Sequence, residues 1–295
     1  MYRPTLALLV GPPGCGKSTY AKRYVRGHDN TVYLSSDQIR QELYGDESIQ
    51  DNPGQVFALM QARAVEALRS WQNVVYDATN MTRKDRAGII AACPKFVKIE
   101  VHVVWAPIET CIERDAARER TVGKKVIDKM LKRFQAPYYD EGIDEIKVVR
   151  PEGFNVNTYF NKVYSDMQIP HDNPHHTFGV LNHCIEAKMY LYNKCNVVIT
   201  ADDDILMTAA MYHDVGKPYV KAFIDSKGNA CEHAHYYQHQ CVGAWISYGL
   251  WIKPDIPWLI STHMDPFLNT KYYNNLPDYL KDKVDLLHEA DLAAH

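Results

Sequence analysis

The chain has 295 residues, and because ordinary domains hold about 100–200 residues, we expect two domains. Hydrophobic residues make up 46% and charged residues 23%, a globular balance that excludes disordered, collagen-like and coiled-coil proteins. No run approaches the roughly 20 apolar residues of a membrane span, and the first residues lack a signal-peptide layout. The seven cysteines are scattered and form no C-x-x-C pair, which argues against a disulfide framework and favours a cytoplasmic protein.

Charge and histidine divide the chain into two halves. Residues 1–150 carry 23 Lys and Arg against 19 Asp and Glu, whereas residues 151–295 carry 10 against 17. Eleven of the 13 histidines lie in the second half. We therefore expect a first domain that meets anions and a second domain that holds cations.

The first half alternates short apolar runs with longer amphipathic stretches. The runs are Leu6–Val10, Thr31–Ser35, Val74–Ala78 and Ile99–Trp105. Strands that alternate with helices indicate βαβ units around a parallel sheet with flanking helices. We therefore predict an α/β domain over residues 1–150.

The second half has helical patterns from about Asn155. They cover Val180–Lys194, Asp203–His213, Gln238–Leu250 and Leu276–Ala294. Pro151-Glu152-Gly153 is the most turn-like stretch near the change in composition. We therefore predict a linker at 151–164 and an all-α domain at 165–295.

The most specific motif lies directly after the first apolar run. Gly11-Pro12-Pro13-Gly14-Cys15-Gly16-Lys17-Ser18 matches G-x-x-x-x-G-K-[ST], and a helical stretch follows it. Its glycines let backbone N–H groups wrap phosphates, Lys17 reaches the β- and γ-phosphates, and the Ser18 hydroxyl binds Mg²⁺. We predict that ATP and Mg²⁺ bind here, at Gly11, Gly14, Cys15, Gly16, Lys17, Ser18 and Thr19.

Two further strand ends carry carboxylates. Asp37 follows the second apolar run, where it can accept a proton from an attacking hydroxyl, and Arg40 can grip the phosphate of the acceptor. The alternative is a helix-capping Asp beside a solvated Arg. Asp77 ends the third run and is a candidate for the Mg²⁺ water shell or the acceptor site, or is a simple capping residue.

A basic segment follows the fourth run. Residues 114–133 contain eight basic and three acidic residues, and Arg114 and Arg118 share one helix face. A mobile basic helix that closes over a triphosphate stabilises charge on the transferring phosphoryl group. The alternative is an ordinary solvated basic face.

These motifs, in this order, resemble the polynucleotide-kinase branch of the P-loop kinases. The resemblance rests on GPPGCGKST, SSDQIR, VVYDATNMTRKDR, RDAARER and FQAPYYDEGIDEI. It implies that Asp37 is the general base for a 5′-hydroxyl, that Arg40 binds the acceptor phosphate and that Arg118 contacts ATP, with Arg120 as a further partner. The family also includes kinases of small alcohols and of tRNA-bound serine.

The second half contains an ordered set of histidines and aspartates. Tyr212-His213-Asp214-Val215-Gly216-Lys217-Pro218 ends a helical pattern, and the other members lie on separate predicted helices. Imidazole and carboxylate without thiolate suit one or two centres of Mn, Fe, Ni, Co, Zn or Mg. The candidate ligands are His183, His213, Asp214, His239, His263 and Asp291.

This H…HD…H…H…D order resembles the HD-domain phosphohydrolases. The resemblance implies that His183, His213, Asp214 and Asp291 hold one metal, and that Asp214 bridges to a second metal completed by His239 and His263. Two such metals generate hydroxide and clamp phosphate oxygens. Lys217 would neutralise phosphate charge.

Other residues stay open as members of this site. His233 and His235 rival His239 as ligands, and His175 and His176 are candidates for the mouth of the site. Tyr236-Tyr237 and Tyr272-Tyr273 could stack on bases, although packing accounts for them more simply.

Together the two resemblances predict a bifunctional end-healing enzyme. It would phosphorylate 5′-OH ends with ATP and remove 3′-phosphates or 2′,3′-cyclic phosphates with transition metals, on RNA rather than DNA, in RNA or tRNA repair. A separate ligase would act downstream, no membrane is involved, and homo-oligomerisation stays open. The alternatives are a small-molecule kinase fused to an HD nucleotidase for free nucleotides, and an ATP-dependent RNA-binding or regulatory module.

Overall fold

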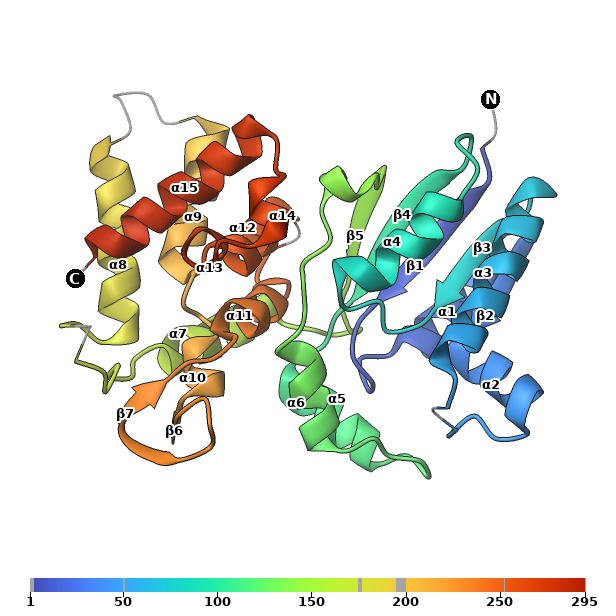
Figure 1. Ribbon diagram of the computed structural model, residues 1–295, viewed down its shortest axis with the longest axis horizontal. Coiled ribbons are helices and arrows are strands. Elements are labelled where there is room, and N and C mark those ends of the chain that lie inside the picture. Colours follow the sequence, from blue (N-terminus) through green and yellow to red (C-terminus); the bar gives the residue numbers. More distant parts are fainter. Residues whose placement is uncertain (1–2, 50, 175–176, 195–199, 252, 295) are drawn as a thin grey trace. The chain divides into compact units, whose positions relative to one another are not determined.

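The computed structural model describes residues 3–49, 51–174, 177–194, 200–251 and 253–294 (Figure 1). The chain divides into two compact units. The first comprises Met1–Met130 and Pro137–Gly153, and the second comprises Leu131–Ala136 and Phe154–His295.

A five-stranded parallel sheet forms the centre of the first unit (Figure 1). Its spatial order is β2-β3-β1-β4-β5. The strands are β1 (Thr5–Val10), β2 (Thr31–Ser35), β3 (Asn73–Asp77), β4 (Lys98–Val104) and β5 (Glu145–Val149). The predicted α/β class is confirmed. The strand β5 is an addition that the sequence analysis does not contain.

Helices flank this sheet. They are α1 (Lys17–Gly27), α2 (Ser36–Tyr44), α3 (Pro53–Arg69), α4 (Arg83–Ala92), α5 (Ile108–Ala116), α6 (Lys124–Leu131) and the short 3₁₀ helix η1 (Tyr139–Glu141). The helix α2 begins directly at the end of β2, where the Ser35 hydroxyl accepts a hydrogen bond from the Asp37 amide at 3.3 Å. In the register of β2 and β3, Ser35 lies beside Asp77. Because the strands are parallel, their carboxyl ends gather the candidate kinase residues at one edge of the sheet.

The second unit is helical apart from one hairpin. Its helices are α7 (Val156–Asp166), α8 (Val180–Lys194), α9 (Ala201–Tyr212), α10 (Lys217–Val220), α11 (His239–Ser247), α12 (Asp255–Thr262), α13 (Asp265–Leu268), α14 (Lys271–Asn274) and α15 (Asp278–Ala293). The hairpin pairs β6 (Ala222–Ile224) with β7 (Ala230–His235). The helical class expected for this half is confirmed, and the hairpin is a further feature. Helix α7 occupies most of the stretch expected as a linker.

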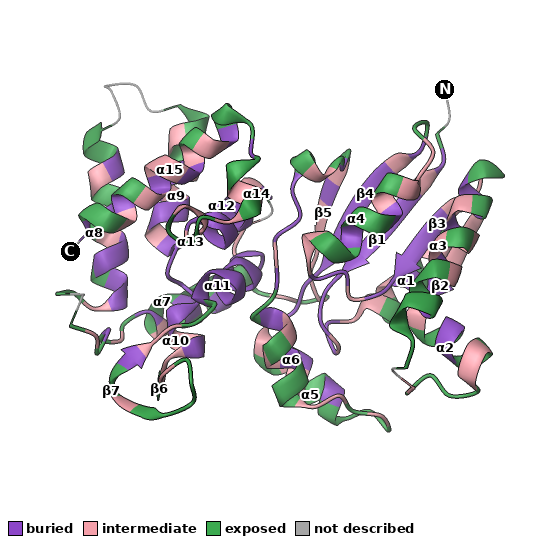
Figure 2. Ribbon diagram, in the orientation of Figure 1, coloured by how far each residue is buried: buried purple, intermediate pink, exposed green. Residues whose placement is uncertain are grey.

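Two helices form the core of this unit. Every residue of α11 is buried, and α12 is buried from Ile256 onward (Figure 2). Phe134, from the short segment Leu131–Ala136, packs edge-on against Trp245 and Tyr248 with ring centroids 5.4 and 6.1 Å away. These contacts explain why that segment belongs to the second unit. Within the described part of the chain, no helix has the length and apolar character needed to cross a membrane.

Candidate active sites of the two units

The phosphate loop joins β1 to α1 and depends on glycine. Gly14 has a φ of 80°, and an added Cβ would lie 2.0 Å from the Cys111 carbonyl oxygen, so no other residue fits. Lys17 begins α1 and donates hydrogen bonds to the carbonyl oxygens of Gly11 and Pro12 at 2.9 and 3.0 Å. The loop therefore presents backbone N–H groups, the start of a helix and an ammonium at one place, which is an anion-binding arrangement.

A pocket of about 490 Å³ opens beside this loop. Its size suits a nucleotide. It is lined by loop and helix residues, by the ends of β4 and β5, and by two arginines of the basic segment, among them Gly14, Cys15, Gly16, Thr19, Trp105, Arg114, Arg118 and Arg150. The structure thus brings the predicted Arg118 next to the predicted phosphate loop.

The predicted acceptor residues lie on α2. Arg40 is 93% buried and donates a hydrogen bond from Nη1 to Asp37 Oδ1 at 3.1 Å, while the Asp37 side chain is more than half exposed. In the described chain, the buried Nε of Arg40 has no hydrogen-bond partner. An exposed carboxylate beside a buried cation with an unused donor is an arrangement that an incoming hydroxyl and phosphate can complete.

Asp77 has a partner that the sequence analysis missed. The Tyr33 hydroxyl donates a hydrogen bond to Asp77 Oδ2 at 2.7 Å. Burial and the neighbouring Asp77 carboxylate raise the pKa of Tyr33 above its ordinary value, so this hydroxyl stays protonated and donates. Tyr33 lies two residues before Ser35 on the same face of β2, a position whose importance only the neighbouring strand reveals.

The basic segment is organised by a buried carboxylate. Asp115 accepts hydrogen bonds from the amides of Val122 and Gly123 at 3.1 and 2.8 Å, which fixes the turn between α5 and α6. Arg120, predicted to contact ATP, instead donates to the Glu47 carbonyl oxygen at 2.8 Å and does not line the pocket. The structure therefore separates Arg120 from Arg118.

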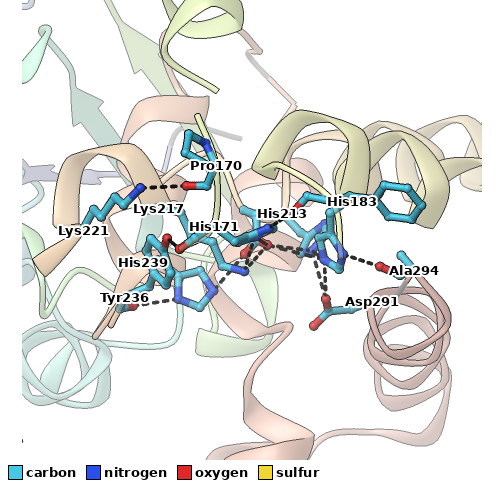
Figure 3. A network of polar contacts seen from close by, with 12 residues as sticks. Pro170, His171, His183, His213, Lys217, Lys221, Tyr236, His239, Asp291 and Ala294 are labelled. Carbon is cyan, nitrogen blue, oxygen red and sulfur yellow. Dashed lines mark hydrogen bonds and ion pairs between the residues drawn. The ribbon is translucent and has the colours of Figure 1, made fainter. Parts of the chain in front are cut away.

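In the second unit, the six predicted ligands come together. Figure 3 labels His183, His213, His239 and Asp291 among them. They form two groups that share Asp214, and within each group the ligand atoms all lie within 4.8 Å of one another. Five helices position them, at the first turn of α8, the end of α9, the start of α11, the end of α12 and the last turn of α15. The groups are His183, His213, Asp214 and Asp291, and Asp214, His239 and His263.

The orientation of the four imidazoles shows what they can bind. Each Nδ1 lies 2.6–2.9 Å from a backbone carbonyl oxygen, those of Ala294, Ala210, Tyr236 and Ile260. A carbonyl oxygen only accepts, so each Nδ1 carries a proton, and the inward-pointing Nε2 is the atom of each ring that can offer a lone pair to a metal. The Nε2 atoms of His183 and His213 are 3.2 Å apart, and those of His239 and His263 are 3.1 Å apart. Facing lone pairs repel each other, so this donor set fits divalent cations.

The electrostatics of Asp214 and His263 agree with this interpretation. Burial opposes protonation of His213, but the neighbouring Asp214 raises its pKa well above the ordinary value, so a metal at this site would have to displace that proton. Burial opposes ionisation of Asp214, but Lys217 and His213 hold its pKa well below the ordinary value. Burial and the neighbouring His239 and His213 lower the pKa of His263 to about 3. Carboxylates that stay charged and an imidazole that stays neutral are the protonation states that metal binding requires.

A further histidine lies at this site. His171 is 98% buried, and its Nε2 lies 3.1 Å from Lys217 Nζ and 3.9 Å from Asp214 Oδ2. Lys217 Nζ in turn lies 2.5 Å from Asp214 Oδ2 and 5.4 Å from the centre of the Tyr236 ring. The sequence analysis identified Lys217 but not His171, which no motif marks.

The rival histidines lie elsewhere. Among the described residues, neither His233 nor His235 belongs to a ligand group, and the His235 ring stacks on Tyr237 with centroids 5.2 Å apart. Tyr236 packs inward on His171 and Lys217. His175 and His176 lie outside the described residues.

Two family models match the chain, one in each of its two halves. A family model described as an AAA domain matches residues 6–137, and a model described as an HD domain matches residues 175–293. The chain therefore has an N-terminal P-loop kinase domain and a C-terminal HD domain.

Individual relatives cover only parts of the chain. A curated relative, transcription factor bHLH140 of Arabidopsis thaliana, is 26% identical over 149 residues, which are 48% of this chain and 15% of that protein. A chain of the Pnkp1/Rnl/Hen1 RNA repair complex is 26% identical with a TM-score of 0.41, covering 44% of this chain and 43% of that one. A fungal RNA kinase is 14% identical with a TM-score of 0.38, covering 55% and 42%. Both TM-scores are low, so the functional argument rests on the domains and the site residues.

Proposed function

The chain joins a P-loop kinase domain to an HD domain, and we propose that it is a nucleic-acid end-healing enzyme. One domain phosphorylates 5′-hydroxyl ends, and the other removes 3′-phosphates or opens 2′,3′-cyclic phosphates. The observation that carries this proposal is the presence, in one polypeptide, of a complete phosphate loop with an exposed Asp37 paired to a buried Arg40, and of a largely buried six-residue ligand set. A cleaved RNA presents both of the ends on which such sites would act.

In the kinase domain, the chain's residues position a donor and an acceptor. Lys17 and the loop amides hold the β- and γ-phosphates of ATP, and Ser18 supplies a hydroxyl ligand for Mg²⁺. Asp37 accepts the proton of the 5′-hydroxyl. The hydroxyl oxygen forms a bond to the γ-phosphorus of ATP as the bond between that phosphorus and the leaving ADP oxygen breaks. Arg40 holds the acceptor phosphate, and Arg118 lies at the pocket wall to stabilise the transferring charge.

In the HD domain, His183, His213, Asp214 and Asp291 would hold one metal, and Asp214, His239 and His263 a second. Two bound divalent metals supply hydroxide at neutral pH and neutralise phosphate oxygens. Lys217 adds a positive charge at the edge of this cluster. Hydrolysis of a 3′-phosphate adds one water and yields inorganic phosphate and a 3′-hydroxyl. Opening of a 2′,3′-cyclic phosphate adds one water and leaves a phosphomonoester beside a free hydroxyl.

The substrate class follows from chemistry and charge. The kinase half carries a net excess of basic residues, which favours a polyanionic acceptor over a sugar or a free nucleoside. The 2′-hydroxyl needed for a cyclic phosphate occurs only in RNA, so we propose RNA ends and a separate downstream ligase. Mn, Ni, Co, Fe and Zn all suit the donor set.

The direct experiment uses an oligoribonucleotide with a 5′-hydroxyl and a 3′-phosphate. It is incubated with the purified protein, ATP and one divalent metal at a time, and both ends are analysed. The proposal predicts a 5′-phosphate and a 3′-hydroxyl on the same strand. Activity on free nucleotides or small alcohols alone would contradict it and would favour a metabolic kinase fused to a nucleotidase.

A further inference from the structure

We propose that His171 is a positioning residue of the HD site, and that it holds the Lys217 ammonium where a phosphate oxygen of the substrate binds. This proposal rests on the hydrolytic function proposed above. His171 lies outside the six-residue ligand set, and among the described residues it belongs to neither ligand group. Its task is therefore different from metal binding.

The geometry fixes the hydrogen on the His171 ring. Nδ1 lies 2.6 Å from the Phe178 carbonyl oxygen, which only accepts, so Nδ1 carries the proton. The Nε2 atom then has a lone pair, and it lies 3.1 Å from Lys217 Nζ. An ammonium has three hydrogens and no acceptor, so Lys217 donates to His171.

Three groups surround the ammonium of Lys217. The Asp214 carboxylate lies at 2.5 Å, the His171 ring at 3.1 Å, and the Tyr236 ring covers it with the centroid at 5.4 Å. The Tyr236 hydroxyl also donates a hydrogen bond to the His171 carbonyl oxygen. His171 therefore braces both the ammonium and the ring beside it.

This arrangement has a functional consequence. A lysine side chain is flexible, and holding it in one place costs conformational entropy unless neighbours fix it. Lys217 already pairs with Asp214 Oδ2, in the carboxylate that both ligand groups share, and this single contact leaves the ammonium free to turn about it. His171 Nε2, which lies 3.9 Å from the same oxygen, supplies a second, neutral acceptor that fixes the direction of the ammonium without adding a charge that would compete with a phosphate.

The test compares two variants of His171. The side chain of His171→Asn places an amide near Nδ1, which keeps the bond to Phe178 and removes the acceptor for Lys217. The longer side chain of His171→Gln reaches the Nε2 position and restores that acceptor. Two quantities are measured: the affinity of the Mn²⁺-loaded protein for inorganic phosphate by calorimetry, and 3′-phosphate removal. Bound metal and 5′-phosphorylation serve as controls.

We expect His171→Asn to weaken phosphate binding and 3′-phosphate removal by about 10- to 100-fold, the usual cost of losing a partner that orients a site residue. His171→Gln should recover most of both, with metal content and kinase rate unchanged in each variant. In a Lys217→Met background, His171→Asn should have no further effect, because the two residues act as a unit.

Three outcomes would overturn the proposal. Loss of metal in His171→Asn would show that His171 is a metal ligand. Equal losses of phosphate binding and 3′-phosphate removal in the Asn and Gln variants would show that His171 does not act as an acceptor for Lys217. Absence of phosphate binding by the wild type would remove the subsite itself. If the expected phosphate-binding pattern appears but the wild type leaves 3′-phosphates intact, the positioning role stands and the proposed substrate fails. If His171→Asn does not fold, His171→Gln alone tests the acceptor role. A Gln variant that binds metal but neither binds phosphate nor removes 3′-phosphates would contradict the proposal.

Discussion

At the scale of single residues, the kinase proposal depends most on Asp37. Its side chain is exposed at the start of α2 and is held by Arg40 rather than by the phosphate loop. Asp37→Asn should reduce 5′-phosphorylation by at least about 100-fold, the contribution expected of a general base, while ATP affinity stays within a few-fold of wild type. Glu42→Gln is the matched control, because Glu42 lies on the same helix and pairs with Arg63. A fully active Asp37→Asn protein would remove the general-base assignment.

The shared ligand Asp214 predicts how many metal ions each variant of the HD site binds. Asp214 belongs to both ligand groups, whereas His239 belongs to one. Elemental analysis of protein purified without chelator should therefore find up to two ions in the wild type, one fewer in His239→Ala and none in Asp214→Ala. Retention of the full complement by Asp214→Ala would contradict a shared carboxylate. His235→Ala, which changes a histidine outside both groups, should bind as much metal as the wild type.

Sequence alone predicts only part of each site. Lys17 and Asp37 lie at fixed spacings from apolar runs, and the six metal ligands follow an ordered pattern, so both sets were visible as motifs. His171 and Tyr33 were not, because their roles come from residues distant in sequence, Lys217 and Asp77. Arg120 is a residue that the sequence motif includes but that contacts another part of the unit. The spacing of the basic segment could not show that Arg120 is the arginine that contacts Glu47.

At the scale of elements, the turn between α5 and α6 depends on Asp115. Its carboxylate satisfies the amides of Val122 and Gly123, and in Asp115→Ala these N–H groups lose their acceptor. We expect the Michaelis constant for ATP to rise by about 3- to 10-fold, because the preceding Arg118 loses its fixed position. HD-site activity should not change. An unchanged Michaelis constant would show that this turn does not position Arg118.

The strands β4 and β5 share a buried charge network that predicts an acid response. Burial disfavours the Glu100 carboxylate, but His102, Lys147 and Lys98 hold its pKa below the ordinary value. The folded state therefore binds this proton less readily than the unfolded state does. The resulting stability is present above about pH 4.3, the usual value for Glu, and is lost as pH falls toward the lower folded pKa.

Hydrogen exchange of the β4 amides measures this effect. In the wild type, protection should fall as the pH is lowered from 5 toward 3, after correction for the intrinsic exchange rate. Glu100→Gln should be less protected at pH 7 and should change less over the same range. An equal pH response in both proteins would show that Glu100 is not the titrating group.

The same network explains why β5 was not predicted. Glu145 and Lys147 interrupt the apolar residues of this five-residue run, so its charge keeps it from standing out as a strand. Its partners become visible only in the structure, where it pairs with β4 along the backbone and Lys147 meets Glu100 at 2.6 Å. The apolar strands β1 to β4 need no such partner to be recognised, and their predicted bounds lie within one residue of the observed ones.

At the scale of the whole molecule, the chain holds two sites with different demands on metals. We expect the kinase site to use ATP with Mg²⁺, an ion that keeps several waters and binds through oxygen, whereas the HD site offers four imidazoles. Each set of candidate residues lies within its own compact unit. We therefore expect the two reactions to be separable by mutation.

The most direct test follows both ends of one oligoribonucleotide, labelled at the 5′-hydroxyl end and the 3′-phosphate end, with the wild type, Lys17→Ala and Asp214→Ala. The account predicts that Asp214→Ala abolishes 3′-phosphate removal and leaves 5′-phosphorylation within a few-fold of wild type. Lys17→Ala should do the reverse, and 3′-phosphate removal should need no ATP. Intact 3′-phosphate removal in Asp214→Ala, or loss of both reactions in each variant, would contradict a chain with two separate end-healing sites.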